Sequence, residues 1–131
     1  MNILLDAMGG DNAPDANIKG ALKAVNQIKA TITLVGKEEV IRNKVKEFTG
    51  KEIEEVSDRL KIKNATETIE MEDGPTDAIR HKKDSSMVVG FKMLKENEGD
   101  VFISAGNSGA LLAGATLIVG RIKGIDRPAL A

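Results

Sequence analysis

Cysteine is absent from the 131 residues, and histidine occurs only once. Within these residues there can be no disulfide bond, no thiolate nucleophile and no metal site built from Cys or His. Aromatic residues make up 2% of the sequence, with neither Trp nor Tyr, so it lacks a stacking platform for single-stranded nucleic acid. A formal net charge of -1 gives no positive field toward nucleic acid or anionic lipid. Recognition of an anion must therefore depend on local groups.

Long hydrophobic runs are also missing. Asp6 interrupts the first apolar stretch, so we expect no secretory signal and a cytoplasmic protein. The most apolar segment, residues 109–120, is shorter than the roughly 20 residues that cross a bilayer and predicts a buried helix instead. Hydrophobic residues still make up 41% of the chain, which is enough to form the core of a globular domain.

Apolar runs of strand length alternate with segments of helical periodicity. Buried strands are predicted at 2–5, 31–35 and 101–104, and a half-buried strand at 60–63. Helices are predicted at about 16–28, 40–48, 76–83, 87–94 and 110–119. Residues 64–72 have no clear pattern.

The first of these helices should bury one face, formed by Ile18, Ala21, Leu22, Val25 and Ile28. The alternation predicts an α/β fold in three layers, with a mainly parallel sheet and helices on both faces. In such sheets ligands bind beyond the carboxyl ends of the strands, where loops lead into helices.

The first candidate site follows the first predicted strand, where residues 6–11 read DAMGGD. Gly9 and Gly10 would let backbone N–H groups approach an anion, and the next helix adds the positive end of its dipole. Asp6 and Asp11 could orient a donor or a basic side chain. Alternatively, the glycines form only a tight turn and Asp11 only a helix cap. The spacing matches no nucleotide-binding motif, so a nucleotide is not indicated.

The second candidate site follows the last predicted strand, where residues 104–109 read SAGNSG. Its backbone N–H groups, including those at Gly106 and Gly109, could hold an oxyanion together with the Asn107 amide and the Ser108 hydroxyl. The alternative is that Asn107 or Ser108 caps the next helix while the glycines permit close packing. Both interpretations can hold together.

A third segment, residues 80–86, reads RHKKDSS, and its basic residues directly precede two serines at the predicted start of a helix. Phosphate binding is a natural use of Lys83 with the hydroxyls of Ser85 and Ser86. A solvated charged face is the alternative. His81 has no nucleophile to pair with, so we predict an exposed histidine without a catalytic role.

Four blocks, in this order, resemble the PlsX family, the phosphate acyltransferases of phospholipid synthesis. They are DAMGGDNAP at 6–14, KKDSSM at 82–87, SAGNSGAL at 104–111 and RPAL at 127–130. Family members are more than twice as long, so residues 1–131 are expected to form the N-terminal α/β part of a longer enzyme. The resemblance also implies a homodimer and a fold like that of isocitrate and isopropylmalate dehydrogenases, shared with phosphotransacetylases.

The resemblance implies transfer of a fatty acyl group from acyl carrier protein (ACP) to inorganic phosphate. The acyl phosphate would pass to a membrane glycerol-3-phosphate acyltransferase for the synthesis of phosphatidic acid. No metal or organic cofactor is expected, and membrane association would be peripheral at most. Residue type and motif membership together predict catalytic roles for Asp11, Asn107 and Ser108. The predicted substrate-binding residues are Gly9, Gly10, Lys83, Ser85, Ser86, Gly106 and Gly109.

Two other functions fit the same residues. A phosphotransacetylase would use coenzyme A thioesters as acyl donors. A non-catalytic scaffold would bind ACP or membrane enzymes without forming a product. A dehydrogenase on the same fold lacks support, because no dinucleotide pattern is present.

Overall fold

The computed structural model describes residues 1–120. In this part of the chain, four parallel strands form one sheet in the order β3-β2-β1-β4. The strands are β1 (Asn2–Asp6), β2 (Thr31–Gly36), β3 (Leu60–Asn64) and β4 (Val101–Ile103). At the centre of the sheet, Leu4 of β1 lies opposite Thr33 on one side and Phe102 on the other. The predicted strands are therefore confirmed, in a mainly parallel sheet.

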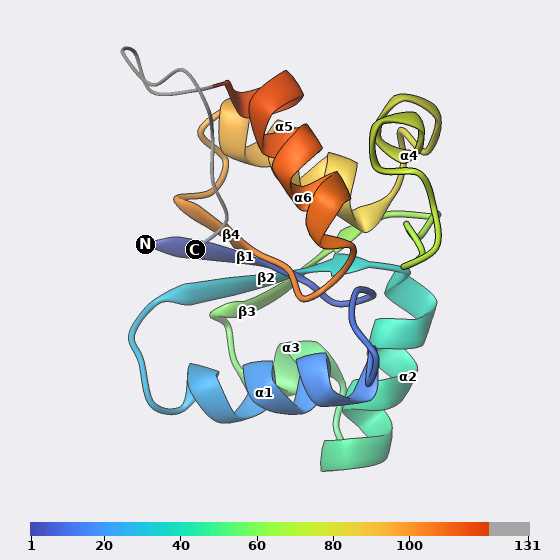
Figure 1. The fold of residues 1–131 in the computed structure, drawn as a ribbon. Coiled ribbons are helices and arrows are strands. Elements are labelled where there is room, and N and C mark those ends of the chain that lie inside the picture. Colours follow the sequence, from blue (N-terminus) through green and yellow to red (C-terminus); the bar gives the residue numbers. More distant parts are fainter. Residues whose placement is uncertain (121–131) are drawn as a thin grey trace.

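Helices cover both faces of this sheet, which confirms the predicted three layers (Figure 1). One face carries α1 (Asp15–Val25), α2 (Glu38–Thr49) and α3 (Ile53–Val56). The other carries α4 (Pro75–His81), α5 (Ser86–Lys95), α6 (Ser108–Gly114) and the π-helical turn η1 (Ala115–Val119). The further likeness to isocitrate and isopropylmalate dehydrogenases stays a prediction.

Local chemistry explains where several of these helices begin and end. Ser85 accepts a hydrogen bond from the N–H of Val88 and so caps α5, as predicted. Gly50 ends α2 in the left-handed region, with φ of 74°. The short helix α3 was not predicted, because one turn shows no periodicity. It is held by a capping box between Glu52 and Glu55.

The first helix ends earlier than predicted. Ile28 lies beyond α1 and is 39% exposed, so its assignment to the buried face was wrong. Arg59 explains the early end, because its guanidinium donates hydrogen bonds to the carbonyls of Val25, Ile28 and Ala30. These bonds provide donors for the carbonyl groups at the end of the helix and in the turn that follows it.

Two predictions of burial near the end of the described chain were also wrong. Val101 and Ile103 of β4 are exposed, because within residues 1–120 β4 forms the edge of the sheet. The last helix is likewise only partly buried, and Leu117 is 56% exposed. The predicted block at 127–130 lies outside the described residues.

The order of the strands defines the place where a ligand would bind. After β1 the chain crosses one face of the sheet through α1 to reach β2, whereas after β4 it enters α6 on the opposite face (Figure 1). The connections therefore diverge between the neighbouring strands β1 and β4. The carboxyl ends of two strands with diverging connections form the usual ligand crevice of open α/β sheets.

Candidate active site

Asp6, the last residue of β1, is the buried centre of this region. Only 2% of its surface is exposed. Its Oδ1 atom accepts hydrogen bonds from the N–H groups of Met8 at 3.0 Å and Gly9 at 3.1 Å, and from the Ser86 hydroxyl at 2.6 Å. Its Oδ2 atom accepts one from the Ser104 hydroxyl at 2.8 Å. The carboxylate therefore joins the loop after β1 to the start of α5 and the end of β4.

The two glycine-rich loops are in direct contact. A Cβ atom added to Gly9 would lie 2.7 Å from Oδ2 of Asp6 and 3.0 Å from Cα of Gly106. Such distances leave no room for a side chain, so glycine is required for this close approach. Gly10 has a φ of 113°, which also favours glycine. Asn17 fixes the first loop by donating hydrogen bonds at 2.9 Å to the carbonyls of Asp6 and Gly9.

The two serines at the start of α5 are buried beneath these loops. Ser85 accepts a hydrogen bond from Val88, and Ser86 donates its hydroxyl to Asp6. Both hydroxyls therefore have partners within the protein. The structure brings Ser86 to the predicted site through Asp6, a contact across 80 positions that no local sequence pattern indicates.

Asn107 caps α6 and also holds a distant loop. Its Oδ1 atom accepts a hydrogen bond from the N–H of Ala110 at 3.1 Å. Its side-chain amide donates to the carbonyls of Glu70, Met71 and Asp73, at distances from 3.0 to 3.3 Å. This geometry agrees with the capping interpretation. Its predicted catalytic role stays a prediction.

Backbone donors remain available around the contact between the loops. Among residues 1–120, no acceptor is found for the N–H groups of Gly10, Ser108 and Gly109. Ser108 is exposed at the first position of α6. Asp11 is exposed as well, and it does not cap α1, because the N-cap position belongs to Pro14.

Lys83 lies apart from the glycine loops. It lines a hollow of about 260 Å³ together with Lys63 and Lys92, and the lining includes none of the loop glycines. Its neighbour Lys82 points elsewhere and contacts Asp73 at 2.7 Å and the carbonyl of Thr68 at 2.8 Å. The structure therefore separates the two lysines of the KKDSSM block. As predicted, His81 is exposed.

The contact between Lys82 and Asp73 fixes the segment before α4. The hydrogen bond from Lys82 lowers the pKa of Asp73 below its ordinary 3.8, and the N–H of Glu70 adds to this effect. The same bond raises the pKa of Lys82. The Asn107 amide holds the same segment by donating to three of the segment's carbonyl groups. Lys82, Asp73 and Asn107 together therefore position the loop beside α6.

The Lys82–Asp73 pair gives a prediction for the dependence of stability on pH. Because the folded state lowers the pKa of Asp73, the stabilisation is complete above about pH 5 and is lost as the pH falls below the ordinary pKa of 3.8 and through the folded pKa. Lys82→Met should therefore lower the melting temperature at pH 7, and the difference from wild type should narrow below pH 4. Thermal unfolding followed by circular dichroism at pH 7, 4 and 2.5 measures this.

Lys83→Met is the matched control, because Lys83 makes no ion pair within residues 1–120. Its melting temperature should stay close to wild type at every pH. A Lys82→Met difference that is equally large at pH 7 and 2.5 would show that the ion pair is not its cause.

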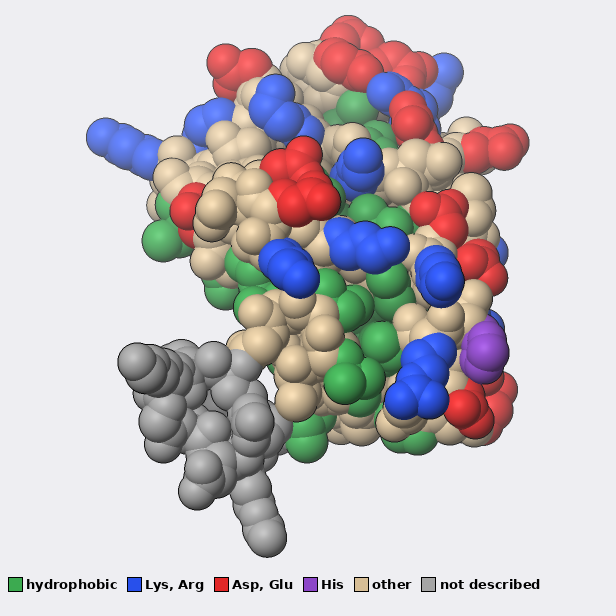
Figure 2. Space-filling view, turned by 90° about the horizontal axis from the view of Figure 1, so that it is seen from above, with side chains coloured by type: hydrophobic (Ala, Val, Ile, Leu, Met, Phe, Trp, Pro, Cys, Tyr) green, Lys and Arg blue, Asp and Glu red, His purple; other side chains and the backbone are tan. Residues whose placement is uncertain are grey.

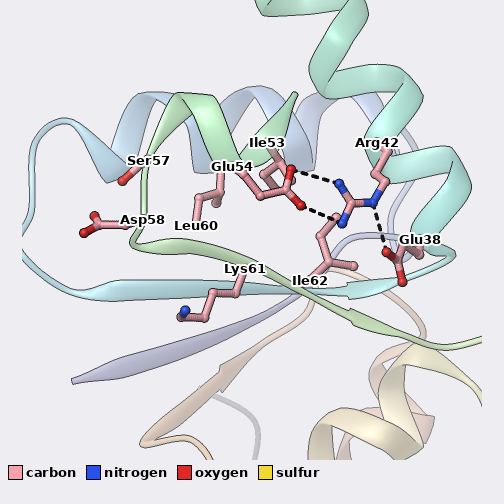
Figure 3. Close-up of a pocket in the computed structure, with 9 residues that line it drawn as sticks. All are labelled: Glu38, Arg42, Ile53, Glu54, Ser57, Asp58, Leu60, Lys61 and Ile62. Atoms are coloured by element: carbon pink, nitrogen blue, oxygen red, sulfur yellow. Dashed lines mark hydrogen bonds and ion pairs between the residues drawn. The ribbon is translucent and has the colours of Figure 1, made fainter. Parts of the chain in front are cut away.

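A larger hollow on the other face of the sheet has different chemistry. It measures about 490 Å³ and lies between α2, α3 and β3 (Figure 3). Arg42 contacts both carboxylate oxygens of Glu54, at 2.8 and 3.0 Å, and one oxygen of Glu38 at 2.9 Å. These bonds raise the pKa of Arg42, chiefly through Glu54. Because Arg42 is already paired with two carboxylates, its cation is not free for a phosphate.

Residues 1–120 contain neither a cluster of metal ligands nor a membrane-spanning helix. No group of three or more His, Asp or Glu side chains there could hold a metal ion. None of the helices in that range has both the length and the apolar character to cross a membrane.

Comparison with known proteins gives the family. The family model described as "Fatty acid synthesis protein" matches residues 1–131. The phosphate acyltransferase of Acetivibrio thermocellus is 56% identical over 131 residues, which are 99% of this chain and 37% of that protein. Those of Thermoanaerobacter pseudethanolicus and Clostridioides difficile are 52% and 49% identical, and the matches cover 100% and 99% of this chain.

These matches agree with the four sequence blocks and confirm the predicted resemblance to PlsX. In each of the three relatives the match covers 37% of the relative's length. The chain belongs to the fatty acid synthesis protein family, and its described part contains the two glycine loops that the resemblance singled out.

Proposed function

We propose that this chain forms part of an enzyme that transfers a fatty acyl group from ACP to inorganic phosphate. The observation that carries the proposal is the contact between the loops after β1 and β4, which leaves backbone donors at the ligand crevice of the sheet. The relatives named phosphate acyltransferase support the same reaction type. We further propose that the enzyme is a cytoplasmic homodimer, and that its product passes to a membrane glycerol-3-phosphate acyltransferase.

The reaction needs no covalent enzyme intermediate, because phosphate is itself a nucleophile. A phosphate oxygen attacks the carbonyl carbon of the thioester, a C–O bond forms, and the C–S bond breaks to release the carrier thiol. The main task of the protein is to orient phosphate and thioester next to each other. This acyl transfer needs neither a bound metal ion nor an organic cofactor.

Negative charge develops on the carbonyl oxygen during the attack, and backbone donors can stabilise it. We assign this role to the N–H groups near Gly10, Ser108 and Gly109, which lack acceptors among residues 1–120. In other acyl-transfer enzymes one such donor contributes about 3 to 4 kcal/mol to the stability of the transition state. The exposed Ser108 hydroxyl can act beside them, with Asp11 orienting a substrate group.

The buried polar groups act in this proposal by holding the loops. Asp6 fixes the first loop, Ser86 supports Asp6, and Asn107 fixes the start of α6. The assignment of Lys83, Ser85 and Ser86 to phosphate stays a prediction. Lys83 would have to act from the separate hollow that it lines.

The test combines the full-length enzyme, palmitoyl-ACP and phosphate, and traps acyl phosphate with hydroxylamine as the hydroxamate. We expect hydroxamate in excess of the phosphate-free reaction, which corrects for direct attack of hydroxylamine on the thioester. Product formed only from coenzyme A thioesters would identify a phosphotransacetylase instead. Binding of ACP without product would indicate a scaffold.

A further inference from the structure

A surface groove between α4 and α6 begins where the candidate active site ends. It measures about 480 Å³ and is widely open to solvent. Its walls are formed by Pro75, Thr76 and Arg80 of α4 and by Gly109, Leu112, Ala113, Thr116 and Leu117 of α6 and η1. Figure 2 looks down on this layer and shows hydrophobic side chains at the surface with Lys and Arg around them.

The contacts between the two helices give the direction of the groove. A Cβ atom on Gly109 would lie 2.6 Å from Pro75, and one on Gly114 would lie 3.1 Å from Ile79. The start of α4 therefore lies against the start of α6, and later residues lie against later residues. The groove accordingly runs from Gly109 toward Arg80 and Leu117.

Gly109 belongs both to the candidate active site and to the groove. Its N–H group is one of the donors proposed for the thioester carbonyl, and its backbone also forms the near end of the groove. A carbonyl group held there would have its attached chain beside Leu112 and Ala113. At the far end, the exposed Leu117 extends the apolar wall, and Arg80, whose methylene groups can pack on apolar surface, also lines the groove.

We propose that this groove binds the alkyl chain of the fatty acyl group, with the carbonyl at Gly109 and the chain end toward Leu117. The inference rests on the proposed acyltransferase function and extends it to chain length. Each methylene that the groove buries strengthens binding, so long chains gain more from it than short ones. The π-helical turn η1 contributes Thr116 and Leu117, in keeping with the frequent occurrence of such turns at functional sites.

Leu117→Asp in the full-length enzyme tests the proposal, because among residues 1–120 this side chain is exposed and lies outside the core. We expect kcat/KM for a palmitoyl-ACP donor to fall at least tenfold. With hexanoyl-ACP, whose chain is too short to need the far end, the value should stay within about twofold of wild type. Thr76→Trp, which fills the groove from the opposite wall, should show the same selectivity.

Val119→Asp is the matched control. Val119 is also an exposed apolar residue of η1, but it does not line the groove. Its ratio of palmitoyl to hexanoyl kcat/KM should equal that of wild type. Equal changes for both donors in Leu117→Asp and Thr76→Trp, or none, would overturn the proposal.

The test also separates other uses of the groove. A changed oligomeric state or melting temperature with an unchanged donor ratio would mean that another segment or a second copy packs there, and would overturn the proposal. Failure of the wild-type enzyme to form acyl phosphate from either donor would instead refute the proposed function.

Discussion

Replacing Asp6 by Ala is expected to lower the free energy of unfolding by about 3 to 5 kcal/mol and to abolish most of the turnover. The carboxylate accepts four hydrogen bonds, two from backbone N–H groups and two from hydroxyls. Hydrogen bonds to charged groups contribute roughly 1.5 to 3 kcal/mol each, but those to one carboxylate are not additive. Thermal unfolding and the hydroxamate assay on the full-length enzyme measure the two effects.

Asp6→Asn should give an intermediate result. It keeps one oxygen for Met8, Gly9 and Ser86 but places an amide where Ser104 now donates. Ser104 can accept from that amide while it keeps the hydrogen bond from Gly106, but its own O–H must turn away from position 6 and loses its acceptor. The expected order of stability is therefore wild type, then Asn, then Ala.

Asp11→Ala is the control for charge removal in the same loop. Asp11 is exposed, so its loss should change stability by no more than about 0.5 kcal/mol. If Asp6→Ala were as stable as Asp11→Ala, Asp6 would not be the centre that joins these loops.

Much of the fold could be predicted because local patterns decide it. The β-branched run at 31–35 gives β2, the spacing of Ile41 and Val45 gives the buried face of α2, and Ser85 gives the start of α5. Each of these signals depends on neighbours within a few residues. The rule that parallel strands place their carboxyl ends together then predicts that both glycine loops lie at one edge of the sheet.

The partners of the buried polar groups could not be predicted in the same way. Ser86 lies 80 positions from Asp6, and Asn107 lies 34 to 37 positions from the carbonyls that it binds. No local pattern specifies which hydroxyl meets which carboxylate. The adjacent Lys82 and Lys83 have the same chemistry, and only the path of the chain at the end of α4 directs Lys82 to Asp73.

Burial of β4 was predicted wrongly for a related reason. A strand with apolar residues such as Val101 and Ile103 has the same sequence pattern whether it lies at the centre or at the edge of a sheet. What distinguishes the two is the presence of a neighbouring strand, which is a property of the whole sheet. Within residues 1–120 the only neighbour of β4 is β1.

Gly9→Ala is expected to reduce turnover by about 100-fold, because it separates the loops that form the candidate site. The added methyl group would lie 2.7 Å from Oδ2 of Asp6 and 3.0 Å from the backbone of Gly106. Asp6 is held by four hydrogen bonds, and the backbone of Gly106 cannot rotate away as a flexible side chain would. The loops must therefore move, and a displacement near 1 Å can cost about 100-fold in rate.

The same substitution should lower the free energy of unfolding by about 1 to 3 kcal/mol, the usual result of overpacking. Gly20→Ala is the matched control, since a Cβ atom there meets nothing within 4 Å and Gly20 lies inside α1. That variant should be more stable than wild type by up to about 1 kcal/mol, with unchanged turnover in the hydroxamate assay. A Gly9→Ala enzyme that melts earlier but keeps its full rate would show that the contact between the loops serves folding alone. The loss of rate is therefore the result that distinguishes an active site at this crevice from a tightly packed turn.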